Sequence, residues 1–254
     1  MGSIETGQRQ KGLSYKPMSW IDKKSIEQVL KLRDKFHIST YIETGTFKGI
    51  NAKFHAQNFK EVLTCDIGEE YLKKAREKLK SYKNVFIYKQ PSPDFLKSFV
   101  ERYNREGRKD IVLLYLDAHF YDPALPPEEK WVVKRELKAL AGFKNCVIYI
   151  HDFDCQGLGH CSYGGEHLDL ELVKDDLLRV NPNFHLYTNS RELCDIYDEK
   201  TIADVPGITL DEDTLDNMRF AHSAERSTYR GILYASPAEL DLNYFELKKA
   251  KMNI

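Results

Sequence analysis

The stretch from residue 38 to 52 combines the residue types of a ligand-binding turn. An acid, Glu43, follows β-favouring residues, and two glycines, Gly45 and Gly49, come next. This pattern predicts a buried strand and then a tight turn in which the backbone can approach a ligand closely. The helix expected after the turn would offer free N–H groups to a negatively charged group. A plain strand-to-helix connection is the alternative that this stretch leaves open.

Two further turns carry polar residues that could hold a nucleoside. Asp66 ends an apolar run and lies 21 residues after Gly45, a spacing that suits a carboxylate on a ribose hydroxyl. It could instead cap the helix that follows. Gln90 and Ser92, in the next turn, could hydrogen-bond to an adenine edge, or simply form a turn with a helix cap.

Two strongly apolar runs end in acids and histidines. The run 111–116 leads into Asp117 and His119, and a second apolar run leads into His151 and Asp152. Such runs are typical of central parallel strands that are buried on both faces. Ligands of open α/β sheets bind outside the carboxyl ends of the strands, so we expect the chemistry of this protein there.

The elements that must position these residues alternate between strand and helix. We expect helices over 19–36, 50–59, 95–103, 128–141 and 168–180, one starting at 69, and strands before Glu43 and over 62–66, 84–88, 111–116, 146–150, 184–187 and 230–235. The pattern predicts an α/β fold, a doubly wound, Rossmann-like, mostly parallel seven-stranded sheet with helices on both faces.

We expect residues 1–37 to form an N-terminal helical cap and residues 38–254 to form the cofactor-binding domain. The glycine-rich segment 156–166 is predicted to be a mobile active-site loop. The sequence assigns no structure to 191–227.

Composition narrows the class of partner. The chain has 254 residues with 38 basic and 39 acidic side chains and a net charge of -1. This balance argues against nucleic acid or a membrane as the main partner. Five cysteines, an odd number, argue against a disulfide framework and favour a cytoplasmic protein. We expect a small-molecule partner, and the sequence leaves a homodimer open.

The pattern Glu43-x-Gly45-x-x-x-Gly49 resembles the glycine motif of class I S-adenosylmethionine-dependent methyltransferases. The chain is similar to their small-molecule O-methyltransferases, both the catechol type and the macrolide-sugar type. The resemblance implies S-adenosyl-L-methionine as cofactor. The cofactor-binding residues that it implies are Glu43, Thr44, Gly45, Thr46, Gly49, Asp66, Gln90, Ser92 and Asp117.

In the metal-dependent members of that family, the acid of the fourth strand and two residues after the fifth strand bind a divalent cation, Mg²⁺ or Mn²⁺. The matching residues here are Asp117, His151 and Asp152. The histidine departs from the family pattern and weakens the case for Mg²⁺, which prefers oxygen ligands. Mn²⁺, Fe²⁺ or Zn²⁺ would accept this set more readily, and Asp154 could supply a replacement oxygen.

Methyl transfer to an alcohol requires loss of the hydroxyl proton, either to a base or with help from a cation. The lysine base of the catechol type is Phe120 here, so that base is absent. We expect Asp117, His119 and His151 to be the catalytic residues, with His119 as the preferred base and His151 as the second choice. A structural role for His119 stays open.

The leading hypothesis is therefore an S-adenosylmethionine-dependent O-methyltransferase for a small hydroxylated acceptor, such as a sugar or sugar-derived natural product. The alternatives are an NAD-dependent oxidoreductase, which lacks support because the third glycine of its fingerprint is missing, and a non-catalytic cofactor-binding protein. An RNA methyltransferase would need a basic stripe. Zinc at Cys155, His160 and Cys161 is a weaker idea, since these residues lack a paired spacing.

Overall fold

A computed structural model describes residues 23–118, 124–126, 129–155, 162–163, 166–189 and 231–251 of the chain. His119, His160 and Cys161, and the unassigned segment 191–227, lie outside the described residues. None of the helices within these ranges is long and apolar enough to cross a membrane.

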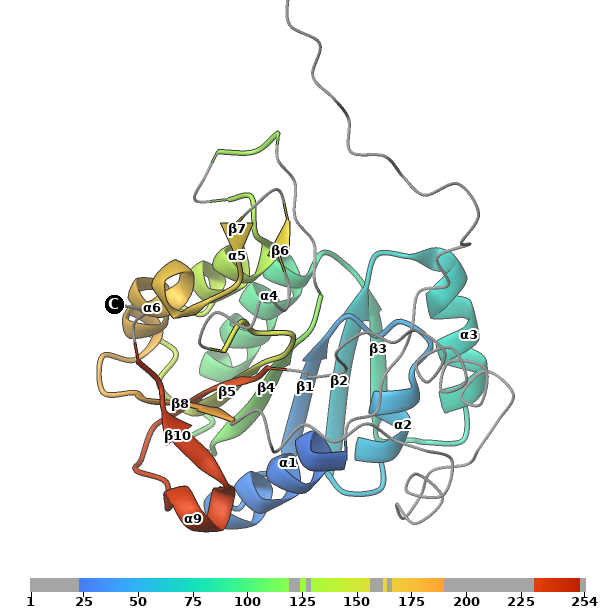
Figure 1. Ribbon diagram of the computed structural model, residues 1–254. Coiled ribbons are helices and arrows are strands. Elements are labelled where there is room, and N and C mark those ends of the chain that lie inside the picture. The colour runs from blue at the N-terminus through green and yellow to red at the C-terminus, as the bar shows by residue number, and fades with distance from the viewer. Residues whose placement is uncertain are drawn as a thin grey trace, which may run out of the picture.

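The described residues contain one eight-stranded sheet in the order β10-β8-β9-β5-β4-β1-β2-β3 (Figure 1). Strands β1 to β5 pair in parallel, whereas β9 lies antiparallel between β5 and β8. The strands are β1 (Thr40–Thr44), β2 (Glu61–Asp66), β3 (Val85–Lys89), β4 (Val112–Leu116), β5 (Cys146–Ile150), β8 (His185–Asn189), β9 (Leu233–Ser236) and β10 (Leu247–Lys249). The doubly wound, mostly parallel fold is confirmed, with one strand more than the seven expected.

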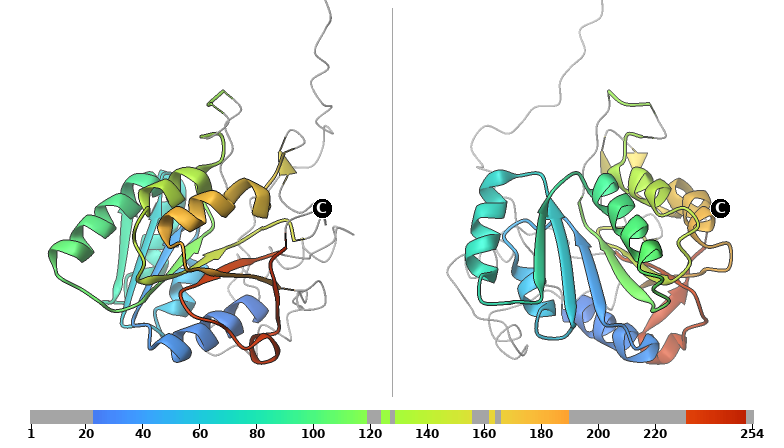
Figure 2. Two further views of the ribbon diagram at one scale, coloured as in Figure 1. Left: turned by 90° about the vertical axis from the view of Figure 1, so that its left-hand side faces the viewer. Right: turned by 180° about the vertical axis from the view of Figure 1, so that it is seen from behind.

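Helices cover both faces of the sheet (Figure 2). One apolar cluster joins the sheet to α1, α2 and α3, and another joins the opposite face to α4, α5 and α6. The helices are α1 (Lys23–Phe36), α2 (Ile50–His55), α3 (Glu69–Leu79), α4 (Ser92–Arg105), α5 (Val132–Ala139), α6 (Leu170–Val180) and the short α9 (Leu242–Phe245).

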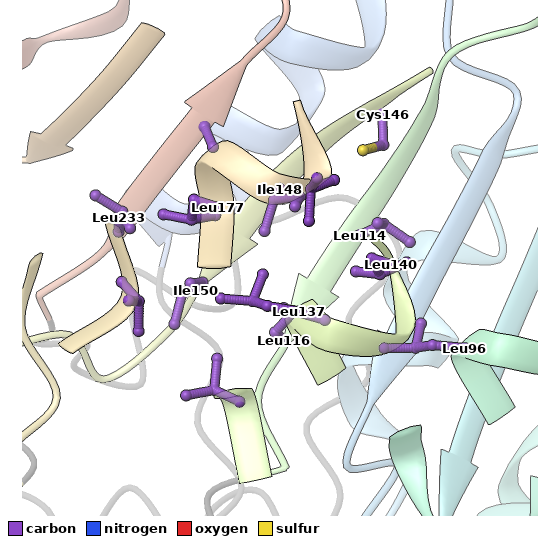
Figure 3. Close-up of a cluster of buried hydrophobic side chains, with 14 of the residues drawn as sticks. Leu96, Leu114, Leu116, Leu137, Leu140, Cys146, Ile148, Ile150, Leu177 and Leu233 are labelled. Atoms are coloured by element: carbon purple, nitrogen blue, oxygen red, sulfur yellow. The ribbon is translucent and has the colours of Figure 1, made fainter. Parts of the chain in front are cut away.

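The central strands β4 and β5 are apolar because both of their faces are buried. Leu116 and Ile150, the last residues of these strands, lie against leucines of the covering helices (Figure 3). Burial of each such side chain contributes about 1.5–3 kcal/mol. This packing fixes the strand ends, from which the candidate site residues project.

Two short elements differ from the sequence prediction. The segment 156–166 was expected to be a loop, but the described residues include an antiparallel pair, β6 (Ser162–Tyr163) and β7 (Glu166–His167). The last strand, β10, follows α9 and pairs with β8. None of the three short strands β6, β7 and β10 has enough residues to give a recognisable alternating pattern.

The chain crosses over between β1 and β4, where the strand order reverses. In open α/β sheets this switch point is where ligands bind, outside the carboxyl ends of the strands. The turns after β1, β2, β4 and β5 therefore define the edge at which function is expected.

Candidate functional site

The turn after β1 is shaped by three left-handed residues: Gly45 (φ 87°), Phe47 (φ 46°) and Gly49 (φ 73°). A Cβ on Gly45 would lie 2.7 Å from the carbonyl oxygen of Asp117. Gly45 is thus required both by its backbone angle and by the close approach of the turn to the end of β4. The turn and Asp117 form one surface.

Glu43 is buried and fully engaged with neighbouring side chains. One carboxylate oxygen accepts a hydrogen bond from Asn51 Nδ2 (2.6 Å) and the other accepts one from Thr64 Oγ1 (2.8 Å). Thr64 is also bonded to Thr46 Oγ1 (2.7 Å). Burial raises the pKa of the Glu43 carboxyl from 4.5 to about 8. Glu43 therefore links β1, β2 and α2 beneath the turn.

Asp66 ties the end of β2 to the glycine turn. Its two oxygens accept backbone hydrogen bonds from Phe47 N–H and Gly68 N–H, both at 2.8 Å. The N-cap of α3 is Gly68 and not Asp66, so the capping alternative is wrong as stated, although Asp66 does bind the N–H of the capping residue. A carboxylate has about four lone-pair positions, so ribose hydroxyls could still bind to Asp66.

The turn after β3 lies beside Asp66, because Gln90 N–H donates to the Asp66 carbonyl oxygen (3.2 Å). Ser92 is buried as the first residue of α4, and the helix cap is Pro91. The sequence did not single out Ile67, whose side chain is 65% exposed next to Asp66. An exposed apolar side chain at this position offers a surface for a flat ring.

The ends of β4 and β5 bring the predicted metal residues together. Leu116 and Ile150 are paired in register, so the residues that follow them, Asp117 and His151, also lie side by side. His151 Nδ1 lies 3.3 Å from an oxygen of Asp117 and 3.3 Å from an oxygen of Asp152. One ligand atom from each of these three residues falls within 4.8 Å of the others. Two carboxylates and one imidazole on this scale fit a divalent transition-metal ion.

The backbone holds this cluster in place. His151 N–H continues the sheet by donating to Leu116 O (3.1 Å), and Asp117 N–H donates to Thr44 Oγ1 (3.1 Å). Asp152 adopts a left-handed conformation (φ 51°), which turns the chain at the end of β5. Asp and Asn tolerate this conformation better than most residues.

A small apolar hollow adjoins the cluster on the α5 side of the sheet. It is lined by residues that include Leu116, Ala118, Trp131, Ile150 and Leu168. Because Ala118 follows Asp117, the hollow opens beside the end of β4.

Several sequence expectations have a different outcome. Asp154 is not in the cluster of three; its side chain faces His167 instead, at 2.9 Å. The thiol of Cys155, one of the three residues considered for zinc, is buried and donates to the Ile232 carbonyl oxygen (3.7 Å). Ligand contacts of the nine cofactor residues stay predictions, as does the role of His119.

Comparison with family models and with curated proteins gives no match. Solved structures with a similar fold include the plantazolicin methyltransferase BamL (16% identity, 85% of this chain and 84% of that chain, TM-score 0.45). Another is an rRNA methylase from Streptococcus thermophilus (10% identity, 87% of this chain and 100% of that chain, TM-score 0.45). A third is the StiE O-MT (11% identity, 84% of this chain and 72% of that chain, TM-score 0.42).

Proposed function

We propose that this protein is an S-adenosylmethionine-dependent O-methyltransferase that acts on a small hydroxylated acceptor, such as a sugar or sugar-derived natural product. The observation that carries the proposal is the junction of the glycine turn with Asp117. Gly45 lies against the Asp117 backbone, and Asp66 is bonded to the same turn. A ligand at this junction would meet the residues of the family motif and the acids of the next strands together.

Three kinds of group are available for the cofactor. Asp66 offers carboxylate oxygens to ribose hydroxyls, and Ile67 offers an apolar face to the adenine. The acid Asp117 stands beside the turn, on the side of β4. A positively charged sulfonium there would be stabilised by the nearby carboxylate.

Asp117, His151 and Asp152 would hold a divalent cation next to the acceptor. A bound cation lowers the pKa of a nearby hydroxyl and so favours its ionised, nucleophilic form. The residues of the chain supply the rest: they hold the acceptor oxygen in line with the methyl group, which is an orientation effect. The imidazole in the set favours Mn²⁺ over Mg²⁺.

Thermal unfolding with S-adenosylhomocysteine tests cofactor binding. A ligand at about 100 times its Kd stabilises the native state by about 2.7 kcal/mol, which is a melting-point rise of roughly 5–10 °C for a chain of this size. NAD should give no rise. The Ile67→Ala variant should unfold at the wild-type temperature but bind S-adenosylhomocysteine more weakly, because it loses only a surface contact.

Tyr244→Ala is the matched control, because Tyr244 is also a large, exposed side chain (57%) but lies in α9. It should bind S-adenosylhomocysteine as the wild type does. Stabilisation by NAD and not by S-adenosylhomocysteine would replace the methyltransferase proposal with the oxidoreductase alternative.

Mn²⁺ should raise the melting temperature of the wild type, and EDTA should reverse the rise. Asp152→Asn should abolish the effect of Mn²⁺, because it removes a charged oxygen ligand while asparagine still tolerates the left-handed backbone. Asp34→Asn, at an acid with a 66% exposed side chain, is the control and should respond like the wild type. Full methyl transfer in EDTA, with no Mn²⁺ effect on melting, would remove the cation from the proposal.

A further inference from the structure

A buried acid and a partly exposed histidine form a pair that the predicted site does not use. His167 Nδ1 lies 2.9 Å from an Asp154 oxygen, and the side chains are 42% and 3% exposed. A carboxylate can only accept a hydrogen bond, so Nδ1 of a neutral His167 carries the proton. Its Nε2 is then left with a free lone pair, which makes that nitrogen a proton acceptor.

The fold holds both partners of this pair. Asp154 N–H donates to the Leu168 carbonyl oxygen (2.7 Å), and Phe153 N–H donates to the Gly231 carbonyl oxygen (2.7 Å). The backbone before Asp154 is therefore fixed to Gly231, which precedes β9, and the backbone after His167 is fixed to Asp154. A base held this way keeps its orientation, which is what catalysis by a positioned side chain requires.

Asp154, one member of the pair, is close along the chain to the proposed cation site. Asp154 is two residues from Asp152, and two residues of chain span at most about 7 Å. Figure 1 shows β7, which ends at His167, on the side of the sheet toward which β1 and β2 point. β7 thus lies toward the carboxyl ends of the parallel strands, where the partly exposed acids Asp117 and Asp152 also follow β4 and β5.

We propose that His167, oriented by Asp154, is the catalytic base that removes the proton of the acceptor hydroxyl. The inference rests on the proposed methyltransferase function and names a residue for its proton-transfer step. His167 Nε2 takes the proton, and the electron pair of the O–H bond stays on oxygen. That oxygen forms the new C–O bond as the S–C bond breaks, with its electron pair left on sulfur, and His167 later releases the proton to water.

The test compares His167→Asn with the wild type in transfer of labelled methyl to catechol, hexoses and nucleotide sugars. Asparagine Nδ2 occupies the position of histidine Nδ1, so this variant keeps a donor for Asp154 and loses only the base nitrogen. We expect the rate to fall by roughly 10²- to 10⁴-fold, the usual contribution of a general base. The melting shift with S-adenosylhomocysteine should be unchanged, because a base for the acceptor does not bind the cofactor.

The control is His185→Asn, at an exposed histidine on β8, which should keep full activity. Long-range ¹H–¹⁵N spectra of the wild type should show His167 in the Nδ1–H tautomer. Wild-type rates in His167→Asn, loss of S-adenosylhomocysteine binding in that variant, an Nε2–H tautomer, or transfer to no hydroxyl of the panel would each overturn the base assignment. A wild type that fails to bind S-adenosylhomocysteine would instead overturn the proposed function itself.

Discussion

At the scale of single residues, Glu43 shows how a motif acid can also be a buried structural group. Its 2% exposure and its bonds to Asn51 and Thr64 explain why an acid at this position is tolerated inside the sheet: both oxygens are satisfied. Thr46 and Thr64 can exchange donor and acceptor roles, so the same network also accommodates a protonated carboxyl. The sequence identified Glu43 but not these partners, because Thr64 lies on a different strand.

The raised pKa of Glu43 predicts a pH-dependent stability. Between its ordinary pKa of 4.5 and the native value of about 8, the native state keeps a proton that the unfolded state has lost. In the ligand-free protein, Glu43 should therefore contribute most to the free energy of unfolding below pH 4.5. This contribution should be lost as the pH rises to 8. The loss is on the order of a few kcal/mol.

Urea unfolding of the wild type and of Glu43→Gln across this pH range measures the effect. Glutamine is neutral at every pH and can donate to Thr64 while accepting from Asn51. The free energy of unfolding of this variant should therefore lack the pH dependence that Glu43 causes. Glu77→Gln, at a 74% exposed acid, should follow the wild type. Parallel curves for the wild type and Glu43→Gln would show that Glu43 is ionised in the native state.

At the scale of elements, the local pattern predicted where strands end but not how two distant segments meet. Asp117 and His151 follow long apolar strands, and parallel pairing of Leu116 with Ile150 brings their side chains together. The pairing of Asp154 with His167, 13 residues later, depends on the short β6–β7 pair. Two-residue strands have no periodicity of their own, and only tertiary contacts define them.

The same limit applies at the C-terminal end of the sheet. The strand β10 holds only three residues, Leu247–Lys249, of which Leu247 is buried and the two lysines are exposed. Its pairing with β8 arises because α9 turns the chain back along the edge. Edge lysines are a common feature of terminal strands, but they do not reveal that a strand is present.

At the scale of the whole molecule, a polar row crosses five neighbouring strands. The register pairs Glu43 with Tyr115, Tyr115 with Tyr149, and Tyr149 with Tyr234, and Tyr234 also pairs with Tyr187. The alternating polar and apolar pattern within each strand could not reveal this row, because the row depends on the order and register of the strands. The row connects the motif acid in β1 with the antiparallel strands at the other end of the sheet.

Helix α1 is attached to this row by side-chain hydrogen bonds as well as by apolar packing. Tyr149 OH donates to Ser25 Oγ (2.6 Å) in a buried position, and the Tyr234 hydroxyl is bonded to Gln28. Val29 and Leu32 add the apolar part of the contact. Helix α1 thus packs into the same apolar core as the sheet.

Removing one hydroxyl from this attachment should weaken the whole molecule. Tyr149→Phe keeps the ring between Tyr115 and Tyr234 but removes the bond to Ser25, at a cost of about 1–2 kcal/mol in the free energy of unfolding. Tyr244→Phe, at an exposed tyrosine, should change that free energy by less than about 0.5 kcal/mol. Combining Tyr149→Phe with Ser25→Ala should cost less than the sum of the two single changes, since both remove the same bond. Strictly additive costs in denaturant unfolding would mean that this hydroxyl does not hold α1 to the sheet, and that apolar packing of the helix suffices.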